Sequence, residues 1–372
     1  MLRRILLIVL PLFVLACQSP TTSSTEGPIL EEPVRGVWLT NVDSEALFSP
    51  EGIEQAVAHC HELGFNTIFV VTWNRAHTLY PSAVMAEKFG REIDPKFKGR
   101  DPLQEVITAA HARGMKVYAW FEFGFSCSYE EPDGGLLIQR NPQWAAIDSS
   151  GNLVSKNGFQ WMNAFDTAVQ DFVLSLLLEV VQHYDIDGIQ GDDRLPAVPS
   201  EAGYDPTTLA RFQQATGRTD TPAQYDEQWI DWRAQLLNEF MGRIHEAVKG
   251  LDPDCRISVS PSIYPWSKEQ YLQDWPTWVQ KGWVDMVCPQ VYRYDIEKYR
   301  REMQKIVEEQ LTASELHHVF PGILLKVGDY VASDTLLQQM VQENRKLGIE
   351  GEVFFFYEGL KRRSKFFDQL YE

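Results

Sequence analysis

Two adjacent aspartates, Asp192 and Asp193, directly follow the apolar run 186–191 near the middle of the chain. Two further carboxyl groups, Glu122 and Glu358, stand at the ends of other apolar runs. Hydrolysis of a glycosidic bond commonly uses two carboxyl groups, because one protonates the leaving oxygen while the other attacks the anomeric carbon or activates water. These four residues are therefore candidate catalytic residues of a glycoside hydrolase.

The four carboxyl groups are expected to have different roles. Consecutive residues of a strand point in opposite directions, so we expect Asp192 to face the site and Asp193 to bind Arg194 or a backbone amide. Aromatic neighbours on both sides of Glu122 are expected to raise its pKa, which suits a general acid. We predict Asp192 as nucleophile or general base and Glu122 as the acid, with Glu358 as the second choice for the acid.

Aromatic and polar side chains also gather where the apolar runs end. This mixture suits a sugar ligand, since aromatic rings stack on C–H surfaces and polar groups fix the hydroxyls. The residues predicted to bind substrate are Arg35, Trp38, Trp73, Asn74, Tyr80, Trp120, Gln190, Arg194, Gln290, Tyr292 and Tyr357.

Other hydrolytic chemistries find little support. Of eight histidines, only His77 falls in a loop after a predicted strand, whereas a histidine-based zinc site needs several. A Gly-x-Ser-x-Gly motif for acyl transfer is missing from the sequence. We therefore expect neither a metal nor a cofactor.

The elements that must position these residues alternate regularly. Eight apolar runs predict buried parallel strands, at 34–40, 67–73, 116–124, 186–191, 256–262, 284–292, 318–325 and 353–357. Helical patterns separate them, at 50–63, 102–113, 166–184, 224–250, 268–282, 297–310 and 333–348. Eight strand–helix steps predict an α/β protein with a single (β/α)8 TIM barrel over 34–372. A doubly wound open sheet is the alternative, but it would lack its Gly-x-Gly-x-x-Gly turn here.

Long connections follow strands two, three and four, at 74–100, 125–165 and 194–223. They contain many aromatic residues, so we interpret them as ordered walls beside the site rather than as disordered loops.

The N-terminus is typical of an exported lipoprotein. Arg3 and Arg4 precede an apolar run, Ile5 to Leu15, that is too short to span a bilayer. The run leads to Val14-Leu15-Ala16-Cys17, which resembles a bacterial lipobox. We expect a signal peptide over 1–16, lipidation of Cys17 and a flexible tether over 17–33, with anchoring to the cell envelope, on the periplasmic side of the outer membrane in a Gram-negative cell.

Composition limits the partners. The formal charge of −18 disfavours nucleic acid, because such a surface repels phosphate. The four remaining cysteines, at 60, 127, 255 and 288, show no metal-binding spacing and are expected to be buried free thiols.

Several of these motifs together resemble glycosyl-hydrolase-like family 10, formerly domain of unknown function 187. The resemblance runs from about 34 to 360 and is carried by Arg35-Gly36-Val37-Trp38, Leu79-Tyr80-Pro81-Ser82, Asp101-Pro102-Leu103, Ala109-Ala110-His111-Ala112-Arg113-Gly114, Asp187-Gly188-Ile189, Asp192-Asp193, Pro289-Gln290-Val291-Tyr292 and Tyr357-Glu358. It implies a barrel distantly similar to those of α-amylases, with Asp192 in the place of the nucleophile. Gln190 stands where amylases usually have arginine, and their acid on the fifth strand has no counterpart.

The chain also departs from the family pattern. Arg194 stands where relatives often have tyrosine, and Glu122-Phe123-Gly124-Phe125 stands where they often have Asn-Pro-Tyr. Lipoprotein members look like hydrolases of peptidoglycan glycan strands. The expected function is thus cleavage of an envelope polysaccharide, with peptidoglycan first; a glycan-binding lipoprotein without catalysis and a hydrolase of another polysaccharide are the alternatives.

Overall fold

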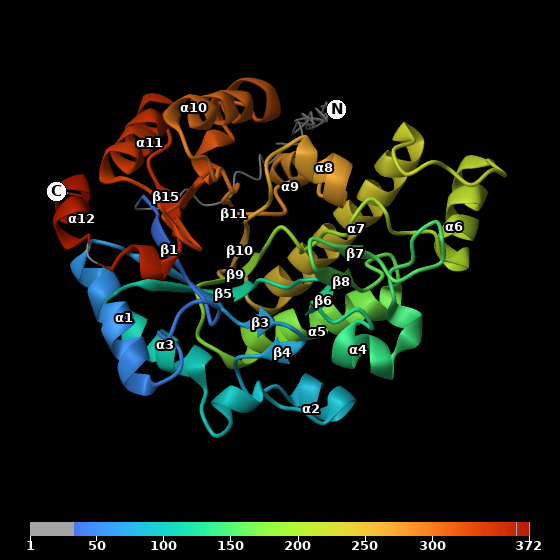
Figure 1. Cartoon of the computed structure of the whole chain (residues 1–372), viewed down its shortest axis with the longest axis horizontal. Helices are drawn as coiled ribbons and strands as arrows, with labels where there is room; N and C mark the ends of the chain where they lie inside the picture. The colour runs from blue at the N-terminus through green and yellow to red at the C-terminus, as the bar shows by residue number, and fades with distance from the viewer. Residues whose placement is uncertain (1–32, 362, 372) are drawn as a thin grey trace, which may run out of the picture.

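The computed structural model describes residues 33–361 and 363–371 (Figure 1). The expected signal peptide 1–16, the lipidation site Cys17 and all but the last residue of the tether 17–33 lie outside this range.

Eight parallel strands form the centre of the molecule. They are β1 (Arg35–Leu39), β2 (Thr67–Val71), β5 (Lys116–Phe121), β9 (Gly188–Gly191), β10 (Arg256–Val259), β11 (Met286–Val287), β12 (Gly322–Leu324) and β15 (Glu352–Phe355). Their order is β11-β10-β9-β5-β2-β1-β15-β12, so consecutive barrel strands are neighbours except for β11 and β12, which stand at the two ends of the order. Parallel bridges from Val287 to Val319 and from Gln290 to Gly322 join the two ends of this sheet. The predicted (β/α)8 barrel is confirmed.

The strands are apolar because both of their faces are covered. All five residues of β2 are buried, as expected for a sheet with side chains filling its interior and helices outside. Inside the barrel, Trp38 Nε1 donates to Gln190 Oε1 at 2.7 Å, and Gln190 Nε2 donates to Ser258 Oγ at 2.9 Å. These bonds satisfy polar groups that would otherwise be costly to bury.

Helices surround the strands (Figure 1). The main ones are α1 (Pro50–Glu62), α3 (Pro102–His111), α5 (Thr167–His183), α7 (Glu227–Leu251), α10 (Ile296–Lys305), α11 (Asp334–Lys346) and α12 (Ser364–Tyr371). Ser49 and Asp101 cap α1 and α3 with side-chain oxygens, and a proline opens each helix, as the sequence pattern predicts.

The predicted helix 268–282 is two helices, α8 (Trp266–Tyr271) and α9 (Trp275–Gln280). The break comes at Leu272, whose φ of 57° is left-handed. The predicted helix 297–310 likewise changes after α10 into a π-helical turn, Ile306–Gln310. Strands six and seven are shorter than predicted.

The three long connections contain secondary structure. The first holds β3 (Trp73–Asn74), β4 (His77–Thr78), α2 (Ala83–Phe89) and the 3-10 turn Pro95–Phe97. The second holds a small antiparallel sheet of β6 (Ser126–Tyr129), β7 (Ser155–Lys156) and β8 (Phe159–Trp161), with α4 (Gly135–Arg140) and the 3-10 turn Pro142–Trp144. The third holds α6 (Pro206–Thr216), and a hairpin of β13 (Lys326–Val327) and β14 (Tyr330–Val331) follows β12.

The four cysteines at 60, 127, 255 and 288 are buried and free, as predicted. Among the helices of the described range, none combines the length and apolarity needed to cross a membrane.

Candidate active site

The guanidinium of Arg194 lies among three carboxyl groups at the ends of β5 and β9. Its Nη2 is 2.8 Å from Asp192 Oδ2 and 3.7 Å from Glu122 Oε1, and its Nη1 is 3.0 Å from Asp193 Oδ1. Its Nε also donates to the backbone oxygen of Glu122 at 2.8 Å. One cation is thus shared by three acids, which would leave the group with net negative charge if all three were ionised.

The backbone around this cluster depends on two glycines. Gly124 has a φ of 48°, and a Cβ there would collide with the backbone oxygen of Arg194. Gly191 closes β9, and a Cβ on it would collide with the oxygen of Leu195. These close approaches bring the end of β5 and the turn after β9 together, so that Phe125 N donates to Arg194 O at 3.0 Å.

Asp193 does not point away from Asp192 as strand alternation predicts. The strand ends at Gly191 and a turn begins, so the alternation of a pleated strand stops before the two aspartates. Both carboxyl groups therefore contact Arg194. The expected pairing of Asp193 with Arg194 is present.

Asp192 is held by neighbouring strands. Its Oδ1 accepts hydrogen bonds from Gln290 Nε2 at 2.7 Å, from the backbone N of Asp193 at 2.8 Å and from Ser260 Oγ at 3.1 Å. Its backbone oxygen accepts from Gln273 Nε2 at 3.0 Å. Ser260 lies near the end of a predicted strand but was not among the predicted binding residues. Gln273 lies in the break between α8 and α9, and no sequence pattern marked it as a site residue.

Glu122 is held more loosely. Its Oε2 accepts a short hydrogen bond from Asn74 Nδ2, and its side chain is 16% exposed, compared with 4% for Asp192 and 24% for Asp193. The side chains of Glu122 and Asp193 are therefore partly exposed to solvent, whereas that of Asp192 is almost fully buried.

Burial and neighbouring charges raise the pKa values of two of these acids. Burial raises the pKa of Glu122, and the Arg194 guanidinium opposes that shift. Burial, with the adjacent Asp193 carboxylate, raises the pKa of Asp192 well above its ordinary value. Acids whose pKa values are raised by burial and by neighbouring carboxylates are candidates for proton transfer.

Aromatic rings enclose the cation. The Arg194 guanidinium carbon lies 4.7 Å from the ring centroid of Phe159 in β8 and 5.6 Å from that of Phe123. Tyr292 is close enough to Asp192 and Asp193 that, after burial, these acids raise its pKa further. Aromatic surface and carboxyl groups therefore meet at one end of the barrel.

A family model described as glycosyl hydrolase-like 10 matches residues 33–330, which is well over half of the chain. The chain belongs to this family. The resemblance expected from the sequence is confirmed, and so is the class of enzyme, a glycosidase.

Relatives of this glycosidase share modest identity with it. Glycosyl hydrolase DigH of Escherichia coli strain K12 is 23% identical over 357 residues, which cover 79% of this chain and 77% of DigH. Glycosyl hydrolase YngK of Bacillus subtilis strain 168 is 24% identical over 294 residues, which cover 70% of this chain and 54% of YngK.

Solved glycosidases share the fold. The PgaB (BpsB) glycoside hydrolase domain of Bordetella bronchiseptica superposes with a TM-score of 0.68 at 14% identity, covering 90% of this chain and 97% of that domain. The catalytic domain of β-amylase from Paenibacillus polymyxa gives a TM-score of 0.60 at 12% identity, covering 91% and 97%. At these identities the likeness shows the barrel architecture alone.

Several predicted binding residues have partners other than the glycosidase's carboxyl groups. Arg35 begins β1, at the opposite end of the barrel, where its guanidinium packs on the ring of Tyr371. Trp73 and Tyr80 are fully buried, and their polar atoms donate to Gly124 O and to Glu179 Oε2. The sequence pattern did not separate core aromatics such as Trp73 and Tyr80 from exposed ones.

Trp38, Trp120 and Gln190 lie inside the barrel. The rings of Trp38 and Trp120 are 6.3 Å apart and almost fully buried, and Gln190 is bonded to Trp38. They form part of the floor below the cluster rather than a surface that a sugar could touch.

Tyr357 and Glu358, which follow β15, have partners outside the cluster. Glu358 binds Lys361 at 2.6 Å and accepts from Ser44 Oγ at 2.8 Å, and neither partner contacts Arg194. Tyr357 packs against His59 of α1, with ring centroids 5.9 Å apart. Among the predicted residues, the structure thus brings together Asn74, Glu122, Asp192, Asp193, Arg194, Gln290 and Tyr292.

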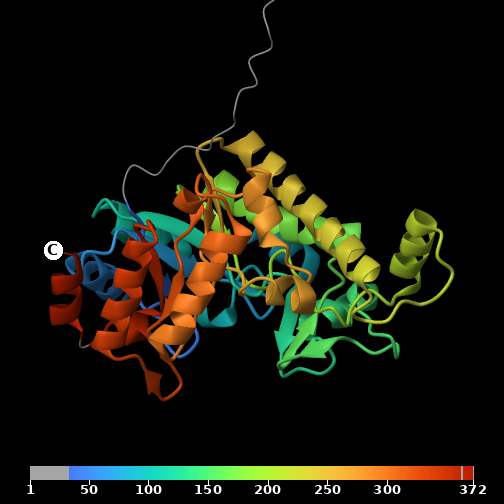
Figure 2. The same ribbon diagram turned by 90° about the horizontal axis from the view of Figure 1, so that it is seen from above.

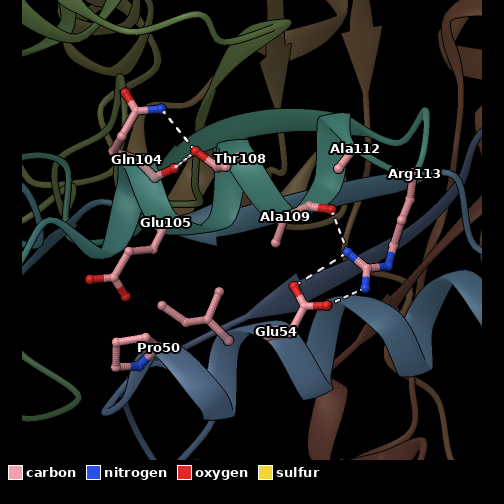
Figure 3. A pocket seen from close by; sticks show the side chains of 9 residues that line it. Pro50, Glu54, Gln104, Glu105, Thr108, Ala109, Ala112 and Arg113 are labelled. Carbon is pink, nitrogen blue, oxygen red and sulfur yellow. Dashed lines mark hydrogen bonds and ion pairs between the residues drawn. The ribbon is translucent and has the colours of Figure 1, made fainter.

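A hollow on the outer surface, between α1 and α3, is not part of this site (Figure 3). Thr108 and Ala109 line it, and Arg113 and Glu54 form an ion pair at its edge. Both helices cover the outside of the barrel, so this hollow is remote from the strand ends that carry the carboxyl groups.

Proposed function

We propose that this protein hydrolyses glycan strands of the cell envelope, with peptidoglycan strands as the leading substrate. The observation that carries the proposal is the set of three carboxyl groups around Arg194 at the carboxyl ends of the strands, where TIM-barrel enzymes build their sites.

Glu122 is proposed as the general acid. It is reachable from solvent, its pKa is raised by burial, and the Asn74 amide fixes its orientation. In the reaction, Glu122 would donate its proton to the glycosidic oxygen as the bond to the anomeric carbon breaks.

Asp192 is proposed as the nucleophile or general base. Gln290, Ser260 and Arg194 hold its two oxygens, so the carboxylate is oriented before substrate arrives. It would attack the anomeric carbon or take a proton from the attacking water. Asp193 is more exposed and is the alternative for this role, so Asp193→Asn belongs beside Asp192→Asn in any test.

The proposed location follows from the N-terminal segment. Lipid on Cys17 would tether the barrel to the envelope membrane. The chain enters the barrel at Arg35, the amino end of β1, so a tether before it joins the rim opposite the carboxyl cluster. The cluster would then face away from the anchor toward an extended polymer. Glycan strands are the abundant polymer of that compartment.

A polysaccharide panel tests the proposal. Purified protein is incubated with peptidoglycan strands stripped of stem peptides, with intact peptidoglycan, with an exopolysaccharide and with an α-glucan, and new reducing ends are counted. Release from stripped strands is expected. Release only from another polymer would change the substrate, and strands retained without release would indicate a glycan-binding protein.

A further inference from the structure

Most of the large apolar side chains that remain well exposed lie on segments that follow barrel strands. Within the described residues, the well-exposed ones are Tyr225, Leu251, Trp266, Tyr294, Val327 and Val331. Leu251 ends α7 near the amino ends of the strands, while the other five are on segments that follow strands. Exposed apolar side chains at the end of the barrel that carries the carboxyl groups are therefore candidates for contact with a ligand.

Two exposed aromatic side chains, Trp266 and Tyr294, are called the two arms of the site. Trp266 is the first arm. It begins α8, is 42% exposed, and its ring is 5.4 Å from that of Tyr271. Asn157, in the turn between β7 and β8, donates to the Tyr271 hydroxyl at 3.0 Å. Burial raises the pKa of Tyr271 to about 12, and the nearby Asp193 carboxylate adds to the shift. Phe159, two residues after Asn157, lies under the Arg194 guanidinium at 4.7 Å, so Trp266 is linked through Tyr271 and this turn to the carboxyl cluster.

Tyr294 forms the second arm. It is 60% exposed and meets the ring of Tyr330 edge-on at 4.6 Å. Tyr330 belongs to the β13–β14 hairpin, so two separate segments hold this pair. Tyr294 follows Tyr292 by two residues, which limits their Cα separation to about 7 Å. Gln290, four residues before Tyr294, donates to Asp192 Oδ1 at 2.7 Å, so the second arm begins near Asp192.

The two arms contact different segments at the carboxyl end of the barrel: Tyr294 contacts the β13–β14 hairpin, and Trp266 is linked through Tyr271 to the β6–β8–β7 sheet. Figure 2 shows the β13–β14 hairpin and the β6–β8–β7 sheet standing apart on the side of the molecule opposite the point where the described chain begins. A short sugar bound at the carboxyl groups would use little of either arm, whereas a long strand crossing the barrel end would contact both.

We propose that Trp266 and Tyr294 stack on sugar rings to either side of the cleaved bond, so that the enzyme binds long glycan strands and cuts within them. This inference rests on the proposed function. It adds two binding residues and a mode of action, cutting within strands.

The test compares Trp266→Ala, Tyr294→Ala and the double variant with Leu251→Ala, a matched loss of exposed apolar surface on the opposite rim. Substrates are long peptide-free peptidoglycan strands and a tetrasaccharide from the same polymer. Each aromatic variant is expected to lose roughly threefold to tenfold in kcat/KM on long strands, from the usual worth of an aromatic contact. On the tetrasaccharide, each is expected to change by less than about twofold. Leu251→Ala should match the wild type on both.

Product size gives an independent readout. Early products from wild-type protein should be long fragments, and release of only mono- or disaccharides would overturn cutting within strands. Equal losses on long and short substrates, or no loss on either, would overturn the binding role of the arms.

Strand retention separates this inference from the proposed function. Asp192→Asn protein should retain long strands in a pull-down, and adding Trp266→Ala and Tyr294→Ala should abolish retention. If wild-type protein cleaves nothing but retains strands, and the aromatic substitutions abolish this retention, hydrolysis is refuted and the binding role of the two arms is supported. Wild-type protein that neither cleaves nor retains strands would overturn both.

Discussion

The two ends of the barrel both carry buried acids, but they neutralise them differently. At the amino end, Asp187 contacts Lys116 Nζ at 2.8 Å and His111 Nε2 at 2.9 Å, and Asp285 contacts Lys249 Nζ at 2.9 Å. Each acid there has at least one basic partner of its own. At the carboxyl end, three acids share Arg194.

This difference separates structural acids from candidate catalytic ones. The amino-end aspartates also accept backbone N–H groups, from Val117 and Ile257 at 2.8 Å, so they tie strands together. The carboxyl-end acids are crowded and short of positive charge, and crowding of this kind keeps protons on carboxyl groups. Perturbed acids of this sort are typical of active sites.

The largest effect should come from Asp192→Asn. Loss of the nucleophile or base is expected to reduce hydrolysis by about 10²–10⁴-fold, while folding is retained because the amide is isosteric. Reducing-end assays on stripped strands, with circular dichroism as the folding control, would check this. Full activity would exclude Asp192 from the reaction. Asp192 would then be a structural acid, like those at the amino end of the barrel.

Among substitutions of the charged residues at the two ends of the barrel, Arg194→Met should lower the free energy of unfolding most. Removing the shared cation leaves three mostly buried carboxyl groups uncompensated, at a cost of about 3–5 kcal/mol. Arg345→Met is the matched variant, because Arg345 pairs with the single buried acid Glu352 at the amino end. Urea unfolding of both proteins would measure the difference; equal losses would contradict the idea of a shared cation.

Glu122→Gln should lower activity by about 10²-fold and change its pH dependence. A general acid must be protonated, so wild-type activity should fall as the pH rises through the raised pKa of Glu122. The variant should lose this alkaline limb. A limb that persists in Glu122→Gln would assign the acid to another group of the cluster.

The same raised pKa values predict the sign of the pH effect on stability. Glu122 and Asp192 hold more protons in the folded than in the unfolded protein between their ordinary and raised pKa values. Their contribution to the free energy of unfolding should therefore decrease as the pH rises through that interval. Thermal unfolding of wild type and the Glu122→Gln, Asp192→Asn double variant across that interval would show whether the slope is reduced.

Asp187→Asn should have the smallest effect. It removes the charge that faces Lys116 and His111 but keeps an oxygen for the Val117 amide. We expect a loss of about 1 kcal/mol in stability and unchanged kcat/KM. A large loss of activity without unfolding would mean that the amino end also takes part in function.

The sequence predicted the barrel well because strand and helix patterns are local properties. The eight apolar runs correspond to the eight barrel strands, and capping residues such as Ser49 and Asp101 mark helix starts correctly. Strands six and seven were predicted too long, and the helix 268–282 was predicted without its break at Leu272. In these segments, loops at the barrel end replace the regular hydrogen bonds of strands and helices.

Binding residues were harder to predict. Tyr80 and Trp73 follow a strand, as site residues do, yet both are core residues, while Trp266 and Tyr294 are exposed beside the site and were not predicted to bind substrate. Aromatic residues are apolar enough for a core and flat enough for a sugar, so residue type does not decide between these uses.

By itself, the sequence determined the number and direction of the strands, and so which end of the barrel holds Glu122, Asp192 and Gln290. Only the tertiary structure decided that Asp193 turns back beside Asp192, that one arginine serves three acids, and that Glu358 belongs elsewhere. Strand periodicity is a property of the neighbouring backbone, whereas the direction of a side chain beyond the strand end depends on turns and partners far away in the chain.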